Sequence, residues 1–186
     1  MCGRYIVDDE TEKDILRLAE VFEAGTFIQV SGDRFPSQKA WVLTKGSKAE
    51  SMIWGFQGRT GTLLINARAE TAMSKPTFSE HVKNRRCVIP AAGFYEWDSS
   101  KNRHTFTGKG TLFLAGFYRT EQDGNHFIIL TTAANSSMKP VHERMPLIFS
   151  EDQIEDWLEN DLTVSRFLRA ESPFLTDVQQ FEQISL

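Results

Sequence analysis

The sequence lacks any long apolar run. No stretch of the 186-residue chain approaches the roughly 18 consecutive apolar residues that a membrane-spanning helix needs. The start of the chain also lacks the basic segment, followed by an apolar one, with which a secretory signal begins. We therefore expect no signal peptide, no contact with a membrane and a cytoplasmic location.

Cysteine and histidine are scarce. The chain has two cysteines and four histidines, and none of them stand at the spacing of a zinc site. In a cytoplasmic protein two cysteines do not indicate a disulfide. The sequence therefore predicts no metal and no other cofactor.

An excess of basic residues is missing as well. The formal net charge is -4, which at first argues against a nucleic-acid partner. The charge is unevenly distributed, however, because residues 1–23 carry -4, residues 150–186 carry -7 and residues 24–149 carry +7. A basic middle between acidic ends can present a phosphate-binding face. A solvated mixture of charges explains the same composition equally well.

The chain does have the composition of a folded core. It is 40% hydrophobic and 11% aromatic, and its length suits one ordinary domain, so we expect a single domain over residues 1–186. Short apolar runs bounded by Gly, Pro, Asn and Ser predict strands between residues 40 and 132. Strands in the middle and helices at the ends favour an α+β fold, with curved, mainly antiparallel sheets that form an open barrel-like core with flanking helices.

The helices are predicted from apolar periodicity and from capping residues. One helix is expected over residues 9–23, with Asp8 or Asp9 as its N-cap, and another over residues 77–85. Ser150 and Gln153 have the spacing of a capping box, which predicts a third helix that runs through Leu158.

Cys2 is the first candidate for chemistry. Initiator methionine is usually removed before a small residue, and removal of Met1 would leave an α-amine and a thiol on the same residue. The amine titrates at about 7.7–8.0, so a useful fraction is neutral near neutral pH. An aldehyde condenses with such an amine to a Schiff base, and the thiol can then close on the same carbon to a five-membered thiazolidine. The alternative is an arbitrary residue at a frayed terminus.

Asn66, Arg68 and Glu70 form a second group of candidates. They alternate with small residues, so in an extended segment their side chains would share one face. The planar fork of an arginine suits a phosphate. The alternative is the solvent-facing edge of a strand.

Glu96 and His142 are the candidates for proton transfer. Glu96 stands among Phe94, Tyr95 and Trp97, where burial would favour the protonated carboxyl. His142 follows a turn-rich segment, and a histidine in a loop can act as an acid or a base near neutral pH. The alternatives are an outward-facing glutamate, which alternation equally allows, and a structural or surface histidine.

Together these residues resemble the SOS-response-associated peptidase (SRAP) family, the abasic-site-processing proteins. The resemblance runs from Met1 to about Phe149, and six short segments occur in the order that the family has. The segments are Met1-Cys2-Gly3-Arg4, Trp54-Gly55-Phe56, Asn66-Ala67-Arg68-Ala69-Glu70-Thr71, Gly93-Phe94-Tyr95-Glu96-Trp97, Thr131-Thr132-Ala133-Ala134-Asn135 and His142-Glu143-Arg144-Met145-Pro146.

The resemblance implies a sensor of abasic sites in single-stranded DNA. Cys2 would link to the opened sugar aldehyde as a thiazolidine, and this covalent crosslink would shield the lesion in the DNA damage (SOS) response. Asn66 would hold the sugar and the terminus, Glu96 would orient the amine and move protons, and His142 would assist ring opening and reversal. The Schiff-base chemistry is lyase-like. The family name adds a peptidase, a hydrolase that processes its own N-terminus, although here only Met1 precedes Cys2.

The resemblance also implies how DNA is bound. Arg4, Arg68 and Arg144 would bind the flanking phosphates, and Thr131 and Trp54 would also contact DNA. The implied partner is single-stranded DNA with an abasic site, and we expect a monomer that needs no metal. In a prokaryote it would be cytoplasmic and associated with the nucleoid when bound to DNA.

Two departures from the family pattern concern the DNA-binding surface. Residues 33–36 read Asp-Arg-Phe-Pro, which keeps the proline of the family's Asn-x-Ala-Pro segment and loses the asparagine. Residues 57–62 replace a loop that is commonly longer and rich in tryptophan and proline. The short loop puts in doubt how the protein would wedge against an adjoining duplex.

The sequence leaves two other functions open. An N-terminal-nucleophile cysteine amidohydrolase also begins with Met-Cys-Gly, but the chain has no Asn-Gly-Glu motif for glutamine and is short for that fold. A non-catalytic module that binds single-stranded DNA would need none of the four catalytic residues.

Overall fold

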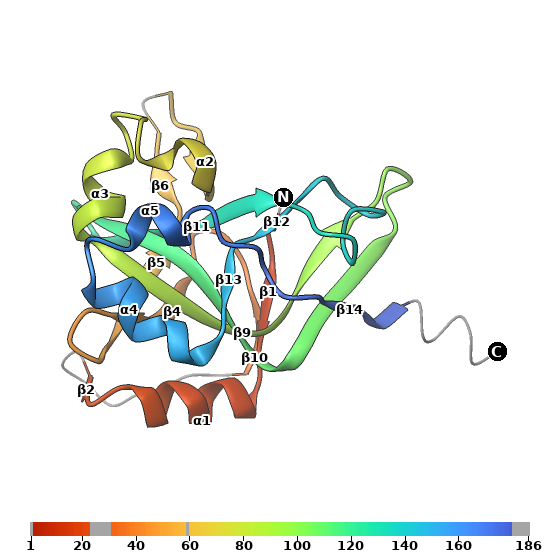
Figure 1. Ribbon diagram of the computed structural model, residues 1–186, viewed down its shortest axis with the longest axis horizontal. Helices are drawn as coiled ribbons and strands as arrows, with labels where there is room; N and C mark the ends of the chain where they lie inside the picture. Colours follow the sequence, from red (N-terminus) through yellow and green to blue (C-terminus); the bar gives the residue numbers. More distant parts are fainter. Residues whose placement is uncertain (1, 23–30, 59, 180–186) are drawn as a thin grey trace.

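The computed structural model describes residues 2–22, 31–58 and 60–179 (Figure 1). The strands, in chain order, are β1 (Tyr5–Val7), β2 (Val21–Phe22), β3 (Gly32–Arg34), β4 (Lys39–Thr44), β5 (Lys48–Trp54), β6 (Phe56–Gln57), β7 (Leu63–Leu64), β8 (Asn66–Arg68), β9 (Arg86–Trp97), β10 (Arg103–Glu121), β11 (Gly124–Ala133), β12 (Arg144–Pro146), β13 (Ile148–Phe149) and β14 (Thr176–Asp177). The helices are α1 (Asp9–Leu18), α2 (Ala69–Ala72), α3 (Ser79–Asn84), the 3-10 turn η1 (Glu151–Gln153), α4 (Ile154–Glu159) and α5 (Val164–Phe167).

The strands form a barrel-like sheet. Neighbouring strands follow the order β10-β11-β5-β4-β9, and β9 pairs back with β10, so five strands close into a ring. The pairing of β11 with β5 is parallel and the other pairings of this ring are antiparallel. The α+β fold with a curved, mainly antiparallel barrel-like core is thereby confirmed.

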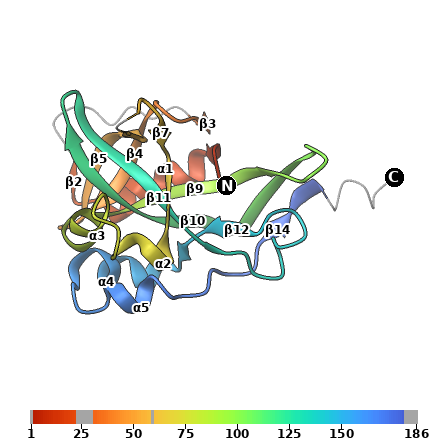
Figure 2. The same cartoon turned by 90° about the horizontal axis from the view of Figure 1, so that it is seen from above.

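The sheet separates two apolar clusters. In β9 the side chain of Val88 belongs to one cluster and that of Ile89 to the other, as expected for neighbours on a strand. The first cluster also includes residues of α1, α3, α4 and α5, which cover that face. Figure 2 shows α2, α3, α4 and α5 gathered along one side of the strands. The second cluster contains Cys2 and the rings of Tyr5 and Trp54.

The capping residues behave as the sequence predicts, and one helix is shorter than predicted. Asp8 caps α1 by accepting the backbone N–H of Thr11 at 2.8 Å, and the capping box of Ser150 and Gln153 is present. The helix expected over residues 9–23 ends at Leu18. After Ala19, which caps the helix, the backbone N–H groups of Glu20 and Val21 donate to the carbonyl of Ser47 at 2.8 and 3.2 Å, which directs the chain into β2.

None of the helices in the described ranges is long and apolar enough to cross a membrane. The helix expected over residues 77–85 is observed as α3, a shorter segment within that range.

Arg86 is a buried cation that joins the sheet to α4. Its side chain is 2% exposed, and its guanidinium donates to the carbonyl oxygens of Trp157 and Leu158 and to the carboxylate of Asp161. It also lies over the Trp157 ring, 5.7 Å from the ring centroid. The charge is therefore compensated by fixed acceptors on the segment that closes the first apolar cluster.

We expect Arg86→Ala to lower the free energy of unfolding by about 3 kcal/mol, because the buried carbonyl oxygens would lose their donor. Asp161→Asn is the matched control, since the Asp161 side chain is 70% exposed. It should cost much less than Arg86→Ala, because an ion pair with an exposed carboxylate contributes little to stability. Urea unfolding measures both. Equal costs for the two variants would contradict the role given to Arg86.

Candidate functional site

Cys2 lies inside the protein and is not frayed. It is 1% exposed and belongs to the second apolar cluster. Its backbone carbonyl accepts a hydrogen bond from Asn66 Nδ2 at 2.9 Å. The chain that follows is held by β1, which pairs with β3 and β9, and by the bond from Tyr95 N to the Arg4 carbonyl at 3.0 Å. Cys2 is thus held in place by the side chain of Asn66 and by the pairing of the strand that follows it.

The thiol of Cys2 is in an environment that opposes its ionisation. Burial raises the pKa of Cys2 to about 12, and the negative charge of Glu96 adds to the increase. Sγ lies 3.7 Å from the carbonyl oxygen of Arg4, which is a weak contact. In the chain that keeps Met1, Cys2 is therefore a neutral thiol near neutral pH.

Glu96 points into the protein. It lies on β9 and is 4% exposed, so the outward-facing alternative is wrong. One carboxylate oxygen accepts the backbone N–H of Trp97 at 3.3 Å. Its charge contributes to the raised pKa of the Cys2 thiol, so the carboxylate lies near Cys2.

Asn66 is held by β8, which pairs in parallel with β11. Its Nδ2 is used by the Cys2 carbonyl, and its Oδ1 is buried without a hydrogen-bond partner among the residues that the structure describes. A buried amide oxygen without a donor costs free energy unless a ligand supplies one. Asn66 can therefore hold the terminus with one atom and accept a hydroxyl group with the other.

Asn66 and Arg68 lie two residues apart in β8, so their side chains share one face of an extended segment, as the sequence predicts. The prediction is wrong for Glu70. The strand ends at Arg68, and Glu70 lies in the first turn of α2. Glu70 instead forms a two-point ion pair with Arg144, with distances of 2.5 and 2.9 Å. Arg68 is exposed, and no ion pair or side-chain hydrogen bond of Arg68 occurs in the described part of the chain. Of Arg68 and Arg144, Arg68 is therefore the one whose guanidinium is accessible.

The Glu70–Arg144 pair adjoins His142. Arg144 Nη2 also donates to the carbonyl of Thr131 at 2.6 Å, so the guanidinium is fixed from two sides. The backbone nitrogen of Arg144 lies 2.9 Å from His142 Nδ1, which is closer than the Arg144 carbonyl oxygen at 3.1 Å. A backbone N–H can only donate, so Nδ1 accepts and the neutral ring carries its proton on Nε2.

His142 is connected to the other candidates through the strands. Its neighbour Val141 packs against the apolar cluster that contains Cys2, and β12 pairs with β11, the strand that also holds β8. A hydrogen bond connects Cys2 to Asn66, the charge of Glu96 acts on the Cys2 thiol, and the strand pairings connect these residues to His142.

Arg4 is surrounded by groups that the sequence did not indicate. Its guanidinium pairs with Asp33 and lies between the rings of Phe35 and Tyr95, 4.8 and 4.6 Å from their centroids. The hydroxyl of Tyr95 donates to the same carboxylate at 3.1 Å. Asp33 occupies the position where the family pattern has asparagine. This departure was the feature of the sequence that could have indicated an ion pair here. Nothing in the local sequence pairs Asp33 with Arg4, since the two come together only through β1 and β3.

Trp54 and Thr131 are not at the surface, which argues against the predicted contacts of their side chains with DNA. Both are 0% exposed. The Trp54 indole donates to the carbonyl of Ile65 at 3.1 Å, one residue before β8, and its ring packs against Tyr5. The hydroxyl of Thr131 donates to the carbonyl of Ala67, within β8, at 3.4 Å. Both residues support the strand that carries Asn66.

One group of potential metal ligands occurs in the described ranges, at the turn between β10 and β11. It comprises Glu121, Asp123 and His126. Arg119 already pairs with Glu121 at 2.8 Å, and the two ring nitrogens of His126 lie at 2.7 Å from the Gly55 carbonyl and 2.8 Å from Asp123. These groups satisfy one another, and Cys2 and the candidates around it are not among them.

Comparisons with known proteins agree on one family. The family described as "SOS response associated peptidase (SRAP)" matches residues 1–184. The abasic site processing protein YoaM of Bacillus subtilis (strain 168) is 30% identical over 208 residues, which cover 100% of this chain and 91% of that protein. The abasic site processing protein YedK of Escherichia coli (strain K12) is 25% identical over 181 residues, with 88% and 82% covered.

Solved structures share the fold. A protein from Bacteroides thetaiotaomicron superposes with a TM-score of 0.77 at 20% sequence identity, covering 94% of this chain and 90% of that chain. A phage-related protein from Bordetella bronchiseptica gives a TM-score of 0.78 at 20% identity, with 94% and 92% covered.

We expect the native chain that keeps Met1 to react slowly with iodoacetamide at Cys2. At about pH 8 the rate should be at least tenfold lower than for the denatured chain, since only the thiolate reacts and its pKa is raised. The rate should rise as the pH increases towards that pKa. Mass spectrometry of digests locates the label. Glu96→Gln should increase the rate, because it removes a charge that disfavours the thiolate. A native rate equal to the denatured one would contradict this environment.

Proposed function

Because the chain belongs to the SOS response associated peptidase (SRAP) family, we propose that it processes abasic sites in single-stranded DNA by bonding Cys2 covalently to the sugar aldehyde. The names of several relatives support a role at abasic sites, since they are called abasic site processing proteins. The adduct would shield the lesion from cleavage.

The observation that carries the proposal is the hydrogen bond from Asn66 Nδ2 to the Cys2 carbonyl at 2.9 Å. It fixes the second residue of the chain beside a buried carboxylate, Glu96. A terminal residue without a role has no need of such an anchor, because the ends of most chains are poorly ordered unless they are tied down.

The reaction begins when Met1 has been removed and the α-amine of Cys2 is free. The neutral amine adds to the aldehyde carbon of the opened sugar, and the resulting carbinolamine loses one water to give a Schiff base. The thiol then adds to the same carbon, its proton passes to the imine nitrogen, and a thiazolidine ring closes. The net change joins Cys2 and the sugar with the loss of one water.

The surrounding groups have suitable chemistry for these steps. Glu96 can take a proton from the amine and return it to the departing hydroxyl. His142 presents its Nε2 proton, since Nδ1 accepts from the backbone, and can protonate the ring oxygen when the sugar opens. The free Oδ1 of Asn66 can accept a sugar hydroxyl.

Phosphates would be bound mainly by Arg68. Its side chain is exposed, whereas the guanidinium groups of Arg4 and Arg144 are paired with Asp33 and Glu70. Those two can contribute if a phosphate competes with the carboxylate. The buried side chains of Trp54 and Thr131 would support β8 rather than contact DNA. Because bases are not read by any of these groups, binding should depend on salt more than on sequence.

We expect the protein without Met1 to form an adduct with single-stranded DNA that contains one abasic site, and the adduct should persist on a denaturing gel. Cys2→Ala should abolish it, because that variant cannot close the thiazolidine ring. DNA without an abasic site should give none.

A retained Met1 is the internal control, since it blocks the amine and leaves the thiol in place. If that form or Cys2→Ala accumulates as much stable adduct as the processed chain, the thiazolidine mechanism is wrong. If DNA binds but the complex disappears in denaturant, the protein is a non-catalytic module.

We expect Asn66→Ala to reduce the rate constant of crosslinking at saturating DNA by about tenfold or more, because the terminus would lose its anchor and its alignment. Arg68→Ala should instead weaken DNA binding and reduce the salt slope of log K by about one, since one phosphate contact is lost. Single-turnover kinetics and fluorescence anisotropy separate the two effects. A change in affinity alone for Asn66→Ala would contradict its positioning role.

A further inference from the structure

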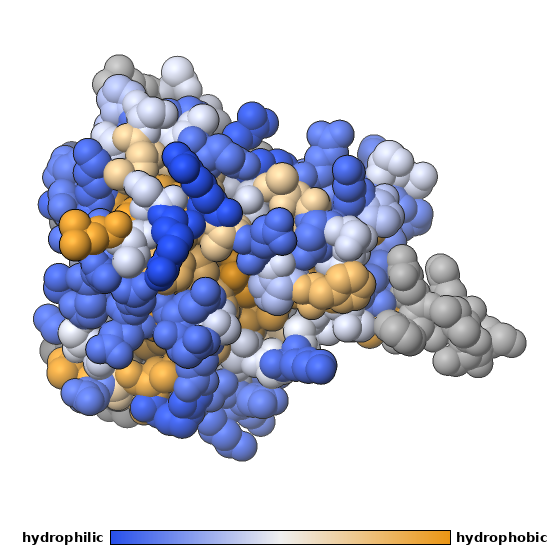
Figure 3. All heavy atoms as spheres, in the orientation of Figure 1, coloured by the Kyte–Doolittle hydropathy of each residue, from blue (hydrophilic) through white to orange (hydrophobic). Residues whose placement is uncertain are grey.

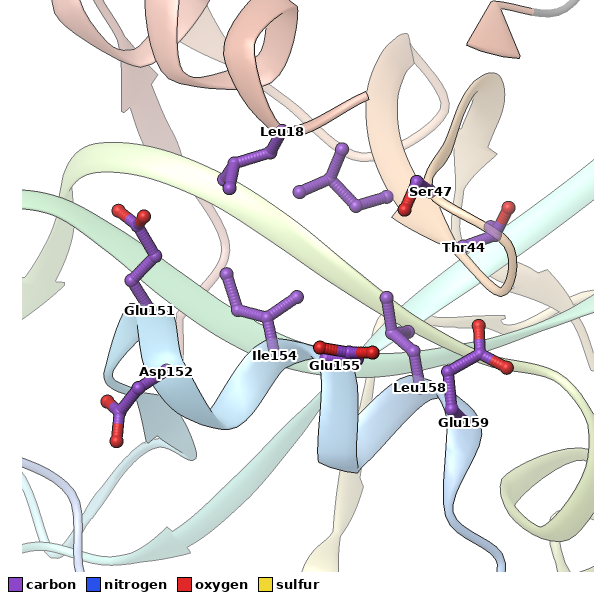
Figure 4. A pocket seen from close by; sticks show the side chains of 10 residues that line it. Leu18, Thr44, Ser47, Glu151, Asp152, Ile154, Glu155, Leu158 and Glu159 are labelled. Carbon is purple, nitrogen blue, oxygen red and sulfur yellow. The ribbon is translucent and has the colours of Figure 1, made fainter. Parts of the chain in front are cut away.

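A cleft of about 550 Å³ lies on the other face of the sheet, between the end of α1, the turn from β4 to β5, and α4 (Figure 4). Its floor is apolar and is formed by Leu18, Leu43, Ile154 and Leu158. Leu43, Ile154 and Leu158 belong to the first apolar cluster, whereas Cys2 belongs to the second. The cleft is therefore separated from the candidate active site by the sheet.

All charged side chains that line this cleft are acidic. They are Glu151, Asp152, Glu155 and Glu159. Figure 4 shows the four carboxylates along the helical side of the cleft, around the side chains of Ile154 and Leu158. The lining therefore presents an apolar floor with a negatively charged border.

Two of the four carboxylates are compensated and two are not. Glu151 pairs with Arg17 at 2.7 Å, and Glu159 lies 3.5 Å from the ammonium of Lys45. No ion pair of Asp152 or Glu155 is found within residues 2–22, 31–58 and 60–179, and both side chains are exposed. The cleft consequently keeps a net negative charge near its apolar floor.

We propose that this cleft docks a short segment of a partner protein that combines leucine-like side chains with lysine or arginine. The apolar side chains would pack on Leu18, which is partly exposed, and on the edges of the other floor residues, and the cations would pair with Asp152 and Glu155. A volume of about 550 Å³ is within the usual range of ligand sites, which is roughly 300–1,000 Å³. A groove between helices is also a common receptor for an amphipathic helix.

Charge complementarity selects this occupant. Phosphate groups of DNA or of an anionic lipid would be repelled by the uncompensated carboxylates of Asp152 and Glu155. A small cation without an apolar body would leave the apolar lining of the cleft uncovered, so no apolar area would be buried to drive association. Figure 3 shows apolar residues reaching the surface between the hydrophilic residues of α1 and α4. A basic, apolar peptide satisfies both features at once.

The position of the cleft lets the two sites act together. A partner bound at α4 would lie across the sheet from Cys2, so it would leave the DNA-binding side open. The protein could then carry a partner while it is bound to a lesion. This inference does not depend on the thiazolidine chemistry.

Fluorescence anisotropy with a labelled twelve-residue helical peptide of leucine and lysine tests the proposal. The leucine–lysine peptide should bind at least tenfold more tightly than a leucine–glutamate peptide and a serine–lysine peptide of the same length. The double variant Asp152→Lys/Glu155→Lys should weaken binding of the leucine–lysine peptide at least tenfold. Leu18→Ala should weaken it as well, because the floor loses apolar area.

The matched control is Glu80→Lys/Glu171→Lys, which makes the same change in net charge at two exposed acids outside the cleft. It should bind the leucine–lysine peptide within about twofold of the parent chain, and circular dichroism should show that all variants are folded. The proposal is overturned if the two double variants weaken binding equally, if the serine–lysine peptide binds as tightly as the leucine–lysine peptide, or if no peptide binds.

Discussion

The hydrogen bond between the Asn66 amide and the Cys2 carbonyl is the constraint on which the candidate site depends. A residue at the second position of a chain has few covalent restraints, so only tertiary contacts can give it a defined place. The bond places the thiol beside Glu96 in a buried environment. Burial has two opposing effects, because it orders the terminus while it makes the thiolate unfavourable. A reaction in which the amine attacks first and the neutral thiol adds later is compatible with both.

The rest of the architecture supports the strand that carries this amide. β8 has three residues and is stabilised by its parallel pairing with β11 and by the buried side chains of Trp54 and Thr131. The ion pair between Glu70 and Arg144 then connects the helix after β8 to the segment that carries His142. Residues that are distant in sequence thus fix the relative positions of the amide, the carboxylate and the imidazole.

Local patterns in the sequence predicted the features that depend on neighbours along the chain. The caps at Asp8 and at Ser150 with Gln153 are set by contacts three residues apart, and both are present. The end of α1 was missed because it is set by the carbonyl of Ser47, a contact between distant residues. Trp54 was assigned to DNA because it belongs to a family motif. Membership in a motif does not separate a residue that touches a ligand from one that supports its neighbours, and only burial makes that distinction.

The central claim is that Cys2 bonds to an aldehyde through both its amine and its thiol. Intact-mass spectrometry of the purified adduct with a short abasic oligonucleotide tests it most directly. The account predicts the mass of the chain without Met1 plus the mass of the oligonucleotide, less one water, and no further gain in mass on treatment with borohydride, because a thiazolidine has no imine left to reduce. An adduct that retains Met1, or one that borohydride must trap before it survives denaturation, would contradict the account.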